Sequence, residues 1–197
     1  MIEANRDSRL ENTPSLARST DPDAIPIALG VAGHIDLDLV HRESLRVNLR
    51  RVFDDFRKRY PNTEPVLLSS LAAGADQLVA EVALECGIQL VVPLPFPAEY
   101  YAKSSAFRSD PDSARRMLEL VGRSDVTSFV VPLPELIADD DAPRWNQIVN
   151  NPDERRRCYA NAGGYVARLR PRDRLPIWHV GERPYWQLRM SWRRQPE

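Results

Sequence analysis

Residues 65–94 read PVLLSSLAAGADQLVAEVALECGIQLVVPL, and this stretch decides the fold class. Its two ends, residues 65–71 and 88–94, are nearly continuous apolar runs of strand length, the pattern of strands that are buried on both faces. Residues 76–86 lie between them with apolar side chains at helical spacing, and Gly87 follows as a stop signal. A strand, a helix and a second strand in this order predict a parallel βαβ unit.

The alternation continues towards the N-terminus. Residues 25–31 (IPIALGV) predict a buried strand that Gly30 and Gly33 close. Residues 37–60 predict a long helix, because their apolar side chains recur at steps of three and four. Pro61 ends this helix.

The alternation also continues towards the C-terminus. Residues 110–121 predict a helix that Asp110 caps, and residues 126–131 (VTSFVV) predict a fourth strand. We expect residues 132–151 to form a long acidic loop. A last helix is expected to open at the segment Asn-Pro-Asp-Glu, residues 151–154, and to run to about residue 169.

These elements predict an α/β fold, a Rossmann-like three-layer domain with a mainly parallel sheet that helices cover on both faces. We expect this domain to occupy residues 25–168. Residues 1–24 are polar and lack a hydrophobic period, so they are expected to be a disordered lead. Residues 169–197 are expected to be a divergent, truncated or frameshifted tail, which would leave the domain incomplete at its C-terminus.

Composition excludes several classes of protein. No apolar run in the 197 residues approaches the roughly 18 residues that a membrane-spanning helix needs, so membrane insertion is not expected. The first residues lack the apolar core of a secretory signal. Cys86 and Cys158 fit no metal-binding spacing, and two thiols without an export signal predict a cytoplasmic location.

The net charge of −1 hides an uneven distribution. Residues 168–197 hold eight arginines against three acidic residues, and three of the four tryptophans lie in the last 20 residues. Residues 1–167 therefore carry a balance of −6. An acidic body argues against broad nucleic-acid binding, because that needs a basic face.

The turns that follow the strands form the candidate site, because ligands of such sheets bind at the carboxyl ends of the strands, near a switch in strand order. In the first turn, Gly30 and Gly33 let a ligand approach the backbone and His34 offers a hydrogen bond, although an ordinary tight turn with a polar helix cap has the same residues. The second turn, residues 69–76, ends in Asp76. This acid either binds a ligand hydroxyl or an exposed amide, or is simply favoured by the helix dipole.

The third turn, residues 93–101, is rich in proline and aromatic residues. It suits either a pocket wall or a rigid loop whose Phe96 and Tyr100 pack inward. Together the three turns describe a cleft edge with backbone donors, without a nucleophile–base set, a cluster of metal ligands or a Walker loop. We therefore expect no catalytic residue, no metal and no cofactor, and we interpret the acidic run at residues 139–141 as a solvated loop.

Two segments, GVAGHIDL (30–37) and SSLAAGADQLVAEVALECGIQLVVPLPFPAEYY (69–101), resemble the SLOG superfamily. The resemblance is closest to prokaryotic members related to the cytosolic ligand-sensing domain of TRPM channels, and it covers about residues 25–168. The superfamily also contains the Lonely Guy phosphoribohydrolases and the DNA-processing protein DprA. The first turn matches the pattern G-x-x-G-H, but Ile35 stands where the family continues with Arg or Tyr.

The resemblance implies a Rossmannoid domain that binds or senses a nucleotide or nucleotide-derived small molecule. A homo-oligomer or an effector protein is a further expected partner. The resemblance also implies ligand contacts at ten positions of the three turns: Gly30, Gly33, His34, Ala73, Gly74, Ala75, Asp76, Phe96, Glu99 and Tyr100.

The C-terminus departs from the family pattern. The family has a further strand, which residues 173–178 echo faintly, and then a Gly-Gly-Thr turn and a helix, which are absent here. The pair Gly163 and Gly164 precedes that strand and is not this turn. We hypothesise that the chain is truncated or read out of frame from about residue 169, which would expose a sheet edge and favour oligomerisation. The alternative is a genuine tail that docks a partner through Trp and Arg.

Two further functions remain as alternatives. A phosphoribohydrolase of the Lonely Guy type would need the motif P-G-G-x-G-T-x-x-E, which is absent from this sequence. A DprA-like DNA-binding protein is disfavoured by the acidic body, although the basic C-terminal segment would suit it.

Overall fold

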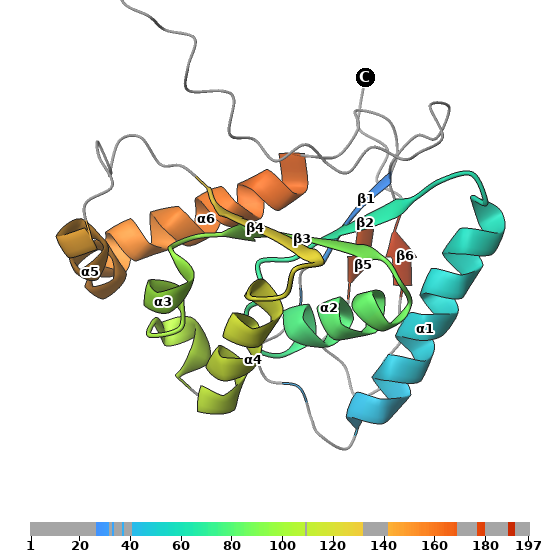
Figure 1. Cartoon of the computed structure of the whole chain (residues 1–197), viewed down its shortest axis with the longest axis horizontal. Coiled ribbons are helices and arrows are strands. Elements are labelled where there is room, and N and C mark those ends of the chain that lie inside the picture. The colour runs from blue at the N-terminus through green and yellow to red at the C-terminus, as the bar shows by residue number, and fades with distance from the viewer. Residues whose placement is uncertain are drawn as a thin grey trace, which may run out of the picture.

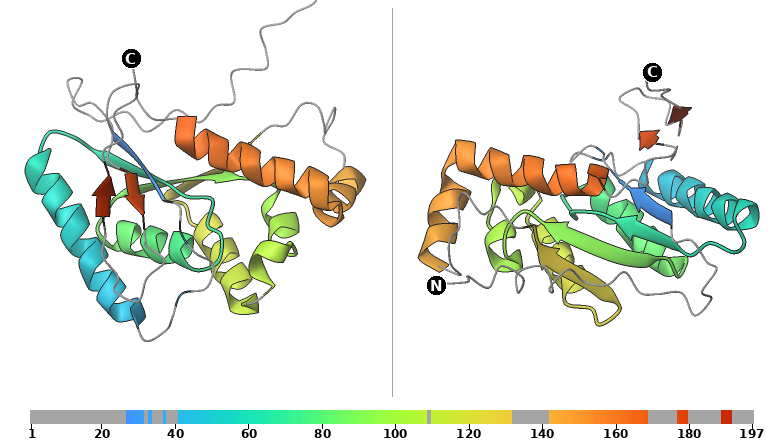
Figure 2. Two further views of the ribbon diagram at one scale, coloured as in Figure 1. Left: turned by 180° about the vertical axis from the view of Figure 1, so that it is seen from behind. Right: turned by 90° about the horizontal axis from the view of Figure 1, so that it is seen from above.

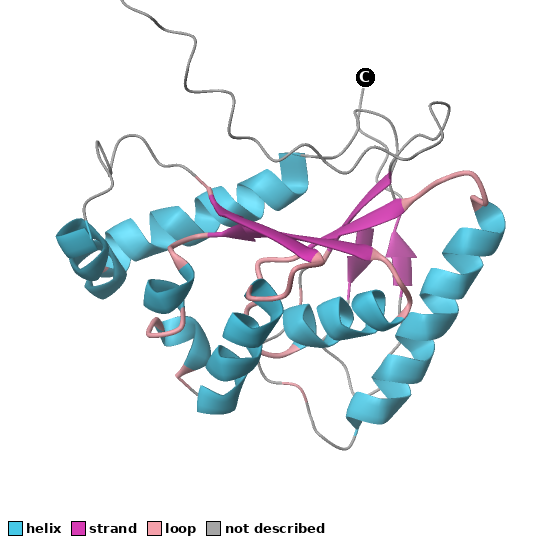
Figure 3. Cartoon of the chain, in the orientation of Figure 1, coloured by secondary structure: helices cyan, strands magenta, loops and turns pink. Residues whose placement is uncertain are grey.

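The computed structural model describes residues 27–31, 33, 37, 41–108, 110–131, 142–168, 177–179 and 189–191. They form an α/β domain in which a four-stranded, all-parallel sheet is flanked by helices (Figure 3), so the predicted Rossmann-like, three-layer fold is confirmed. In chain order the elements are β1 (Ile27–Gly30), α1 (Arg42–Arg59), β2 (Pro65–Leu68), α2 (Ala75–Glu85), β3 (Gln89–Leu94), α3 (Ala98–Tyr101), the 3₁₀ helix η2 (Ser105–Phe107), α4 (Pro111–Val121), β4 (Val126–Val130), α5 (Ala142–Asn150), α6 (Pro152–Arg168), β5 (Ile177–His179) and β6 (Arg189–Ser191).

The strand order in the sheet is β1-β2-β3-β4, the same as the order in the chain. Each crossover therefore leads to the neighbouring strand, and a uniform hand of crossover places the connecting helices on the same face. Figure 1 shows α1, α2 and α4 on one face of the sheet and α6 on the other, and the rear view in Figure 2 shows the same arrangement. Among these four strands the order never reverses, so the sheet has no switch point that would mark a ligand site.

Alternate side chains of the central strands serve the two faces. Leu67, Leu90 and Val92 belong to the large core beneath α1, α2 and α4. Val66, Leu68 and Val91 point the other way and pack with Tyr165 and Val166 of α6. The edge strands β1 and β4 are only half-buried, whereas every residue of β2 is buried. The continuous apolar pattern of residues 65–71 thus marks the central strand β2, whose two faces are both covered.

The predicted helix signals are confirmed at two helix starts. The Asp110 side chain accepts a hydrogen bond from the Ser113 amide at 3.3 Å, with Pro111 at the first helical position of α4. Asn151 accepts bonds from the amides of Asp153 and Glu154 at 3.0 and 3.3 Å, and so caps α6.

The long helix predicted for residues 37–60 begins at Arg42, and Leu37 is not helical. The predicted acidic loop is also wrong in part. Residues 142–150 were expected within an acidic loop, but they form α5. Trp145, Ile148 and Val149 are buried in the main core, at the spacing of one helical face. Tertiary burial of these three side chains stabilises a helix that is too short to be recognised by its length. The acidic run at 139–141 lies outside the described residues.

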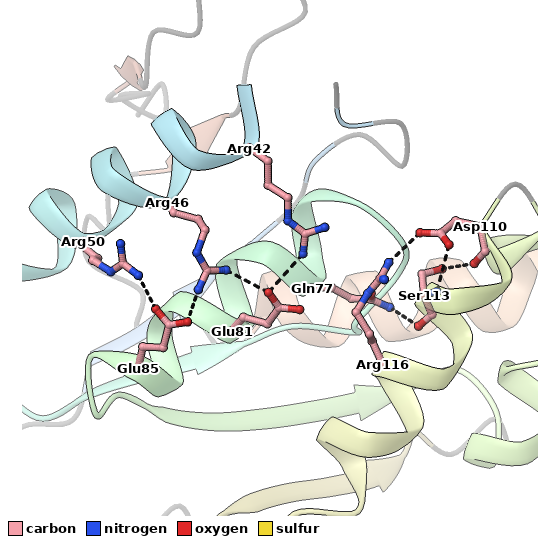
Figure 4. Close-up of polar contacts among 9 residues, drawn as sticks. All are labelled: Arg42, Arg46, Arg50, Gln77, Glu81, Glu85, Asp110, Ser113 and Arg116. Carbon is pink, nitrogen blue, oxygen red and sulfur yellow. Dashed lines mark hydrogen bonds and ion pairs between the residues drawn. The ribbon is translucent and has the colours of Figure 1, made fainter. Parts of the chain in front are cut away.

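Helices α1 and α2 are joined by a ladder of ion pairs (Figure 4). Arg42 and Arg46 contact the Glu81 carboxylate at 3.3 and 3.0 Å, Arg46 also pairs with Glu85, and Arg50 contacts Glu85 at 2.7 Å. The side chains of Arg50 and Glu85 are 41% and 42% exposed, and ion pairs at the surface contribute about 0–1 kcal/mol each. The apolar face of α1, with Leu45, Leu49 and Phe53 buried, therefore supplies most of the stability of this packing.

Outside the four-stranded sheet, β5 and β6 pair antiparallel with each other, with Trp178 opposite Met190. The faint strand signal in residues 173–178 thus coincides in part with β5, which forms a separate two-stranded sheet. No helix in the described part of the chain combines the length and apolar character needed to cross a membrane.

The two adjacent glycines of α6 give a test of the fold. A methyl group added at Gly163 or Gly164 would meet no atom within 4 Å. Since alanine loses less conformational entropy in a helix, we expect Gly163→Ala and Gly164→Ala each to raise the free energy of unfolding by about 0.5–1 kcal/mol, measured by urea denaturation with an unchanged m-value. Gly87→Ala is the matched control: with a φ of +68° at this position, it should be destabilising. Loss of stability in both α6 variants would contradict the helix packing described above.

Candidate functional site

The first, second and third turns leave the sheet at one edge, because the carboxyl ends of parallel strands lie together. Backbone pairing continues just beyond the strand ends. The Val31 amide donates to the Leu68 carbonyl at 3.2 Å, and the Ser69 amide donates to the Val91 carbonyl at 3.2 Å. The turns after β1, β2 and β3 therefore start side by side.

The second turn has an unusual backbone that buried polar side chains hold in place. Leu71 has a φ of 54° and Gly74 a φ of 84°, and the left-handed conformation costs a leucine roughly 1–2 kcal/mol. Ser69 Oγ accepts a bond from the Leu71 amide at 3.1 Å. Gln77 Nε2 donates to the Leu71 carbonyl at 3.2 Å and to the Ser113 carbonyl of α4 at 2.8 Å.

Gln77 is a key residue that is absent from the predicted site. Its Oε1 accepts a bond from Arg116 Nε at 3.4 Å, and Arg116 in turn contacts Asp110 at 2.6 Å (Figure 4). The amide of Gln77 therefore links the second turn to the start of α4. The sequence holds one sign of this role: Gln77 is a long amide side chain in an otherwise apolar helix. Such a side chain needs hydrogen-bond partners when it is buried.

Asp76 joins the first turn to the second. Its carboxylate accepts hydrogen bonds from the backbone amides of Gly33 and Ala72, and the residue is only 9% exposed. Burial raises the pKa of Asp76 from 3.8 to about 7, and the two amide donors offset part of this rise. Asp76 also lies in the first turn of α2, where the helix dipole favours an acid.

Gly30 and Gly33 of the first turn lie in direct contact with neighbouring elements. A Cβ added at Gly33 would lie 2.4 Å from the Cβ of Ala75, and one added at Gly30 would lie 3.0 Å from Val166 Cγ1 of α6. Glycine at position 33 is therefore required by the close approach of two backbones. This contact explains why residue 33 is glycine without any ligand. The same contact holds the first and second turns together at this point.

The third turn packs inward. Phe96 is fully buried, and its ring lies 5.4 Å from that of Tyr159 and 6.2 Å from those of Tyr101 and Trp145, centroid to centroid. Tyr159 donates to Ser104 Oγ at 2.9 Å. Burial raises the pKa of Tyr101, and the negative charge of Asp76 raises it further. The rigid-loop interpretation of Phe96 thus agrees with its packing, although the turn also includes the short helix α3.

The predicted site residues differ in accessibility. Gly30, Gly33 and Glu99 are exposed, and Gly74 and Tyr100 are half-buried. Four others are buried and face the interior: Ala73, Ala75, Asp76 and Phe96. His34 lies outside the described residues. The accessible candidates are thus backbone at the first and second turns and side chains at the start of α3.

Buried polar residues are concentrated at this edge. Within the described ranges they are Ser69, Asp76, Gln77, Ser104 and Ser113. Ser69 and Asp76 belong to the second turn, and Gln77 bonds to it. Ser113 on α4 accepts a bond from Gln77, and Ser104 follows the third turn and bonds to Tyr159. Polar groups at the carboxyl edge thus fix the shape of these turns.

Both cysteines of the chain lie in the described residues, and neither is an activated thiol. Burial raises the pKa of the Cys158 thiol to about 11, and burial also raises the pKa of Cys86, so both thiols stay protonated near neutral pH. In the part of the chain that the structure describes, no three His, Cys, Asp or Glu side chains converge to hold a metal ion.

Comparison of the chain with models of known protein families, with curated proteins and with solved structures finds no significant match.

Substitution of Gly33 tests the contact between the first two turns. Gly33→Ala should lower the free energy of unfolding by about 1–3 kcal/mol, because the new methyl group overlaps that of Ala75. The Gly33→Ala change should cost clearly less when it is introduced into an Ala75→Gly background, which removes the overlap. Urea denaturation of the four proteins measures this coupling. Equal costs in the two backgrounds would show that Gly33 and Ala75 are not in contact.

The pKa of Asp76 predicts how stability varies with pH. A carboxyl whose pKa is higher in the folded than in the unfolded chain binds more protons when folded, so its contribution is present below the unfolded pKa and is lost as pH rises towards 7. The stability of the wild type minus that of Asp76→Asn should therefore fall by up to about 1.4 kcal/mol per pH unit between pH 5 and 7. Asp112→Asn, an exposed change on α4, should leave this profile unchanged, and a flat difference curve for Asp76→Asn would refute the assignment.

Proposed function

We propose that this domain binds a nucleotide or nucleotide-derived small molecule at the carboxyl edge of its sheet. The observation that carries the proposal is the junction of the first and second turns. Through Gly33 and Asp76 the two turns form one surface, on which the exposed glycines of the first turn adjoin the start of α2. Glycine-rich backbone beside a helix start suits a phosphate or a ribose hydroxyl.

The start of α2 supplies the hydrogen-bond donors for this function. The first bond within the helix runs from the Leu78 amide to the Gly74 carbonyl at 3.2 Å. The amides of residues 75–77 precede it and so have no partner within the helix. Together with the positive end of the helix dipole, they favour an anionic group beside Gly74. Gly74, whose φ of 84° favours glycine, has no side chain to cover the backbone at this point.

The start of α3 supplies side chains at the rim of the same edge. Glu99 is exposed and Tyr100 is half-buried, with the Lys103 ammonium 6.0 Å from the centre of the Tyr100 ring. A carboxylate can accept hydrogen bonds from ribose hydroxyls, and an aromatic ring can stack on a base. These contacts would give selectivity to a site whose affinity comes from backbone donors.

A thermal-shift titration of the full chain with AMP and with ADP-ribose tests the proposal. Either compound should raise Tm progressively with its concentration, corresponding to about 2.7 kcal/mol of added stability at 100 times Kd. Glu99→Ala should weaken binding on the order of tenfold, as expected for the loss of one or two hydrogen bonds, without lowering Tm in the absence of ligand.

Glu119→Ala is the matched control for this titration. Glu119 is an exposed glutamate near the end of α4, which leads to the opposite, amino edge of the sheet. The variant should bind as the wild type does. If neither compound shifts Tm at millimolar concentration, the domain does not bind nucleotides of this kind and the proposal fails.

A further inference from the structure

We propose that two copies of this chain pair antiparallel through the outer edges of their β4 strands, so that their two sheets form one continuous sheet across a two-fold axis. This inference goes beyond the proposed function, because it concerns a surface between copies and holds whether or not a nucleotide binds. Strand β4 lies at the margin of the sheet (Figure 2, right), and among the described residues it pairs with β3 alone.

The backbone of β4 directs alternate residues away from the sheet. The Val131 amide, just past the end of the strand, donates to the Leu94 carbonyl of β3 at 2.9 Å. Backbone groups of residues two apart in a strand point the same way, so those of Thr127 and Phe129 also face β3. The amide and carbonyl of Ser128, in the middle of β4, therefore face outward. An edge of this kind is a template for a further strand.

The side chains of β4 do not block such pairing. Its sequence, Val-Thr-Ser-Phe-Val, contains neither a charged residue nor a proline, which are among the devices that prevent pairing at a sheet edge. The nearby charge of Asp125 is neutralised by Arg123, which contacts its carboxylate at 2.8 and 2.6 Å. All five residues of the strand are half-buried. A further strand would cover the area that they still expose.

The order of residues in β4 fits a second copy of the same strand. With Ser128 on the two-fold axis, the two Ser128 residues exchange both backbone hydrogen bonds, and Val126 of one copy lies opposite Val130 of the other. These valines are on the face that packs on the main core. On the other face Thr127 lies opposite Phe129, a pair of β-branched and aromatic side chains of the kind that stabilises neighbouring strands.

Helix α4 favours a second copy over an isolated peptide strand. Arg116 Nε donates to Gln77 of α2 at 3.4 Å, so this side of α4 faces α2. Ala114, Leu118 and Val121 recur at steps of four and three on the side that is turned away from α2, and the side chain of Leu118 is 41% exposed. Since α4 contacts the edge strand β4, an α4 helix from a second copy could cover these apolar side chains. A single added strand would leave them in water.

Sedimentation equilibrium of the ligand-free full chain at micromolar concentrations tests this inference. The wild type should be a dimer. Ser128→Pro should weaken the dimer on the order of tenfold or more, because proline removes the outward amide and leaves the bonds to β3 intact. A monomeric wild type leaves the edge to another occupant and overturns the proposal, as does a folded Ser128→Pro that dimerises like the wild type.

Ala28→Pro is the matched control, at the opposite edge of the sheet. The amides of Ile27 and Val31 donate to the carbonyls of Glu64 and Leu68, so Ala28 directs its own amide outward from β1. This variant introduces the same residue at an equivalent position of the other edge strand. It should dimerise as the wild type does.

Disulfide trapping tests the register and decides the question if Ser128→Pro does not fold. The Cα atoms of a hydrogen-bonded antiparallel pair lie about 5.5 Å apart, within the reach of a disulfide. In a Cys86→Ser background, Ser128→Cys should therefore give a covalent dimer on oxidation, detected on a non-reducing gel. Thr127→Cys should not, because position 127 is two residues, or about 7 Å along the strand, from its counterpart. Absence of the cross-link at position 128, or equal cross-linking at both positions, overturns the proposal.

Discussion

A polar group that is removed from water needs a hydrogen-bond partner, and this requirement shapes the carboxyl edge of the sheet. The turn after β2 has a left-handed leucine, which is unfavourable by itself. It persists because Ser69 and Gln77 bond to both backbone groups of Leu71. Asp76 then needs donors of its own and takes them from Ala72 and Gly33. The polar groups of the second turn thus reach Gly33 of the first.

The strand order decides how the helices are distributed between the two faces of the sheet. Because β1 to β4 follow one another in space as in sequence, three of the crossover helices share one face, and α6 covers the other with few buried apolar contacts. The beginning of α6 contributes to the large core through Cys158, whereas its end rests on the smaller cluster through Val166. One helix therefore belongs to both faces, and it passes the carboxyl edge between them.

Much of this fold follows from local pattern in the sequence. Continuous apolar strands, helical periodicity, Asp110 with Pro111, and Asn151 with Pro152 each specify an element or its start without any tertiary knowledge. The strand order cannot be predicted in this way. A βαβ pattern shows that two strands are parallel, but not whether they are neighbours in the sheet. Helix α5 cannot be predicted from local pattern either. A helix of nine residues is stable only because Trp145, Ile148 and Val149 are buried in the core.

The site is less predictable than the fold, for reasons that the individual residues make clear. Glycines and small residues mark places of close approach, but the same residues serve packing and ligand binding alike, and the contact of Gly33 with Ala75 is visible only in the structure. Whether Asp76 points to solvent or back to the chain depends on an amide from a segment more than 40 positions away in sequence. Gln77 acts through Ser113 on another helix. Such pairings become visible only in three dimensions.

The charge ladder between α1 and α2 carries less information than its regularity suggests. Arginines at every fourth position face glutamates at every fourth position, so sliding α1 by one turn would bring Arg50 opposite the same two glutamates that Arg46 now contacts. The ion pairs alone therefore do not distinguish the observed alignment from one that is shifted by a turn. The apolar face does distinguish them, because the same slide would move Phe53 into the place of Leu49 and Arg57 into the place of Phe53. Side-chain volume, and not electrostatics, therefore sets the alignment of the two helices.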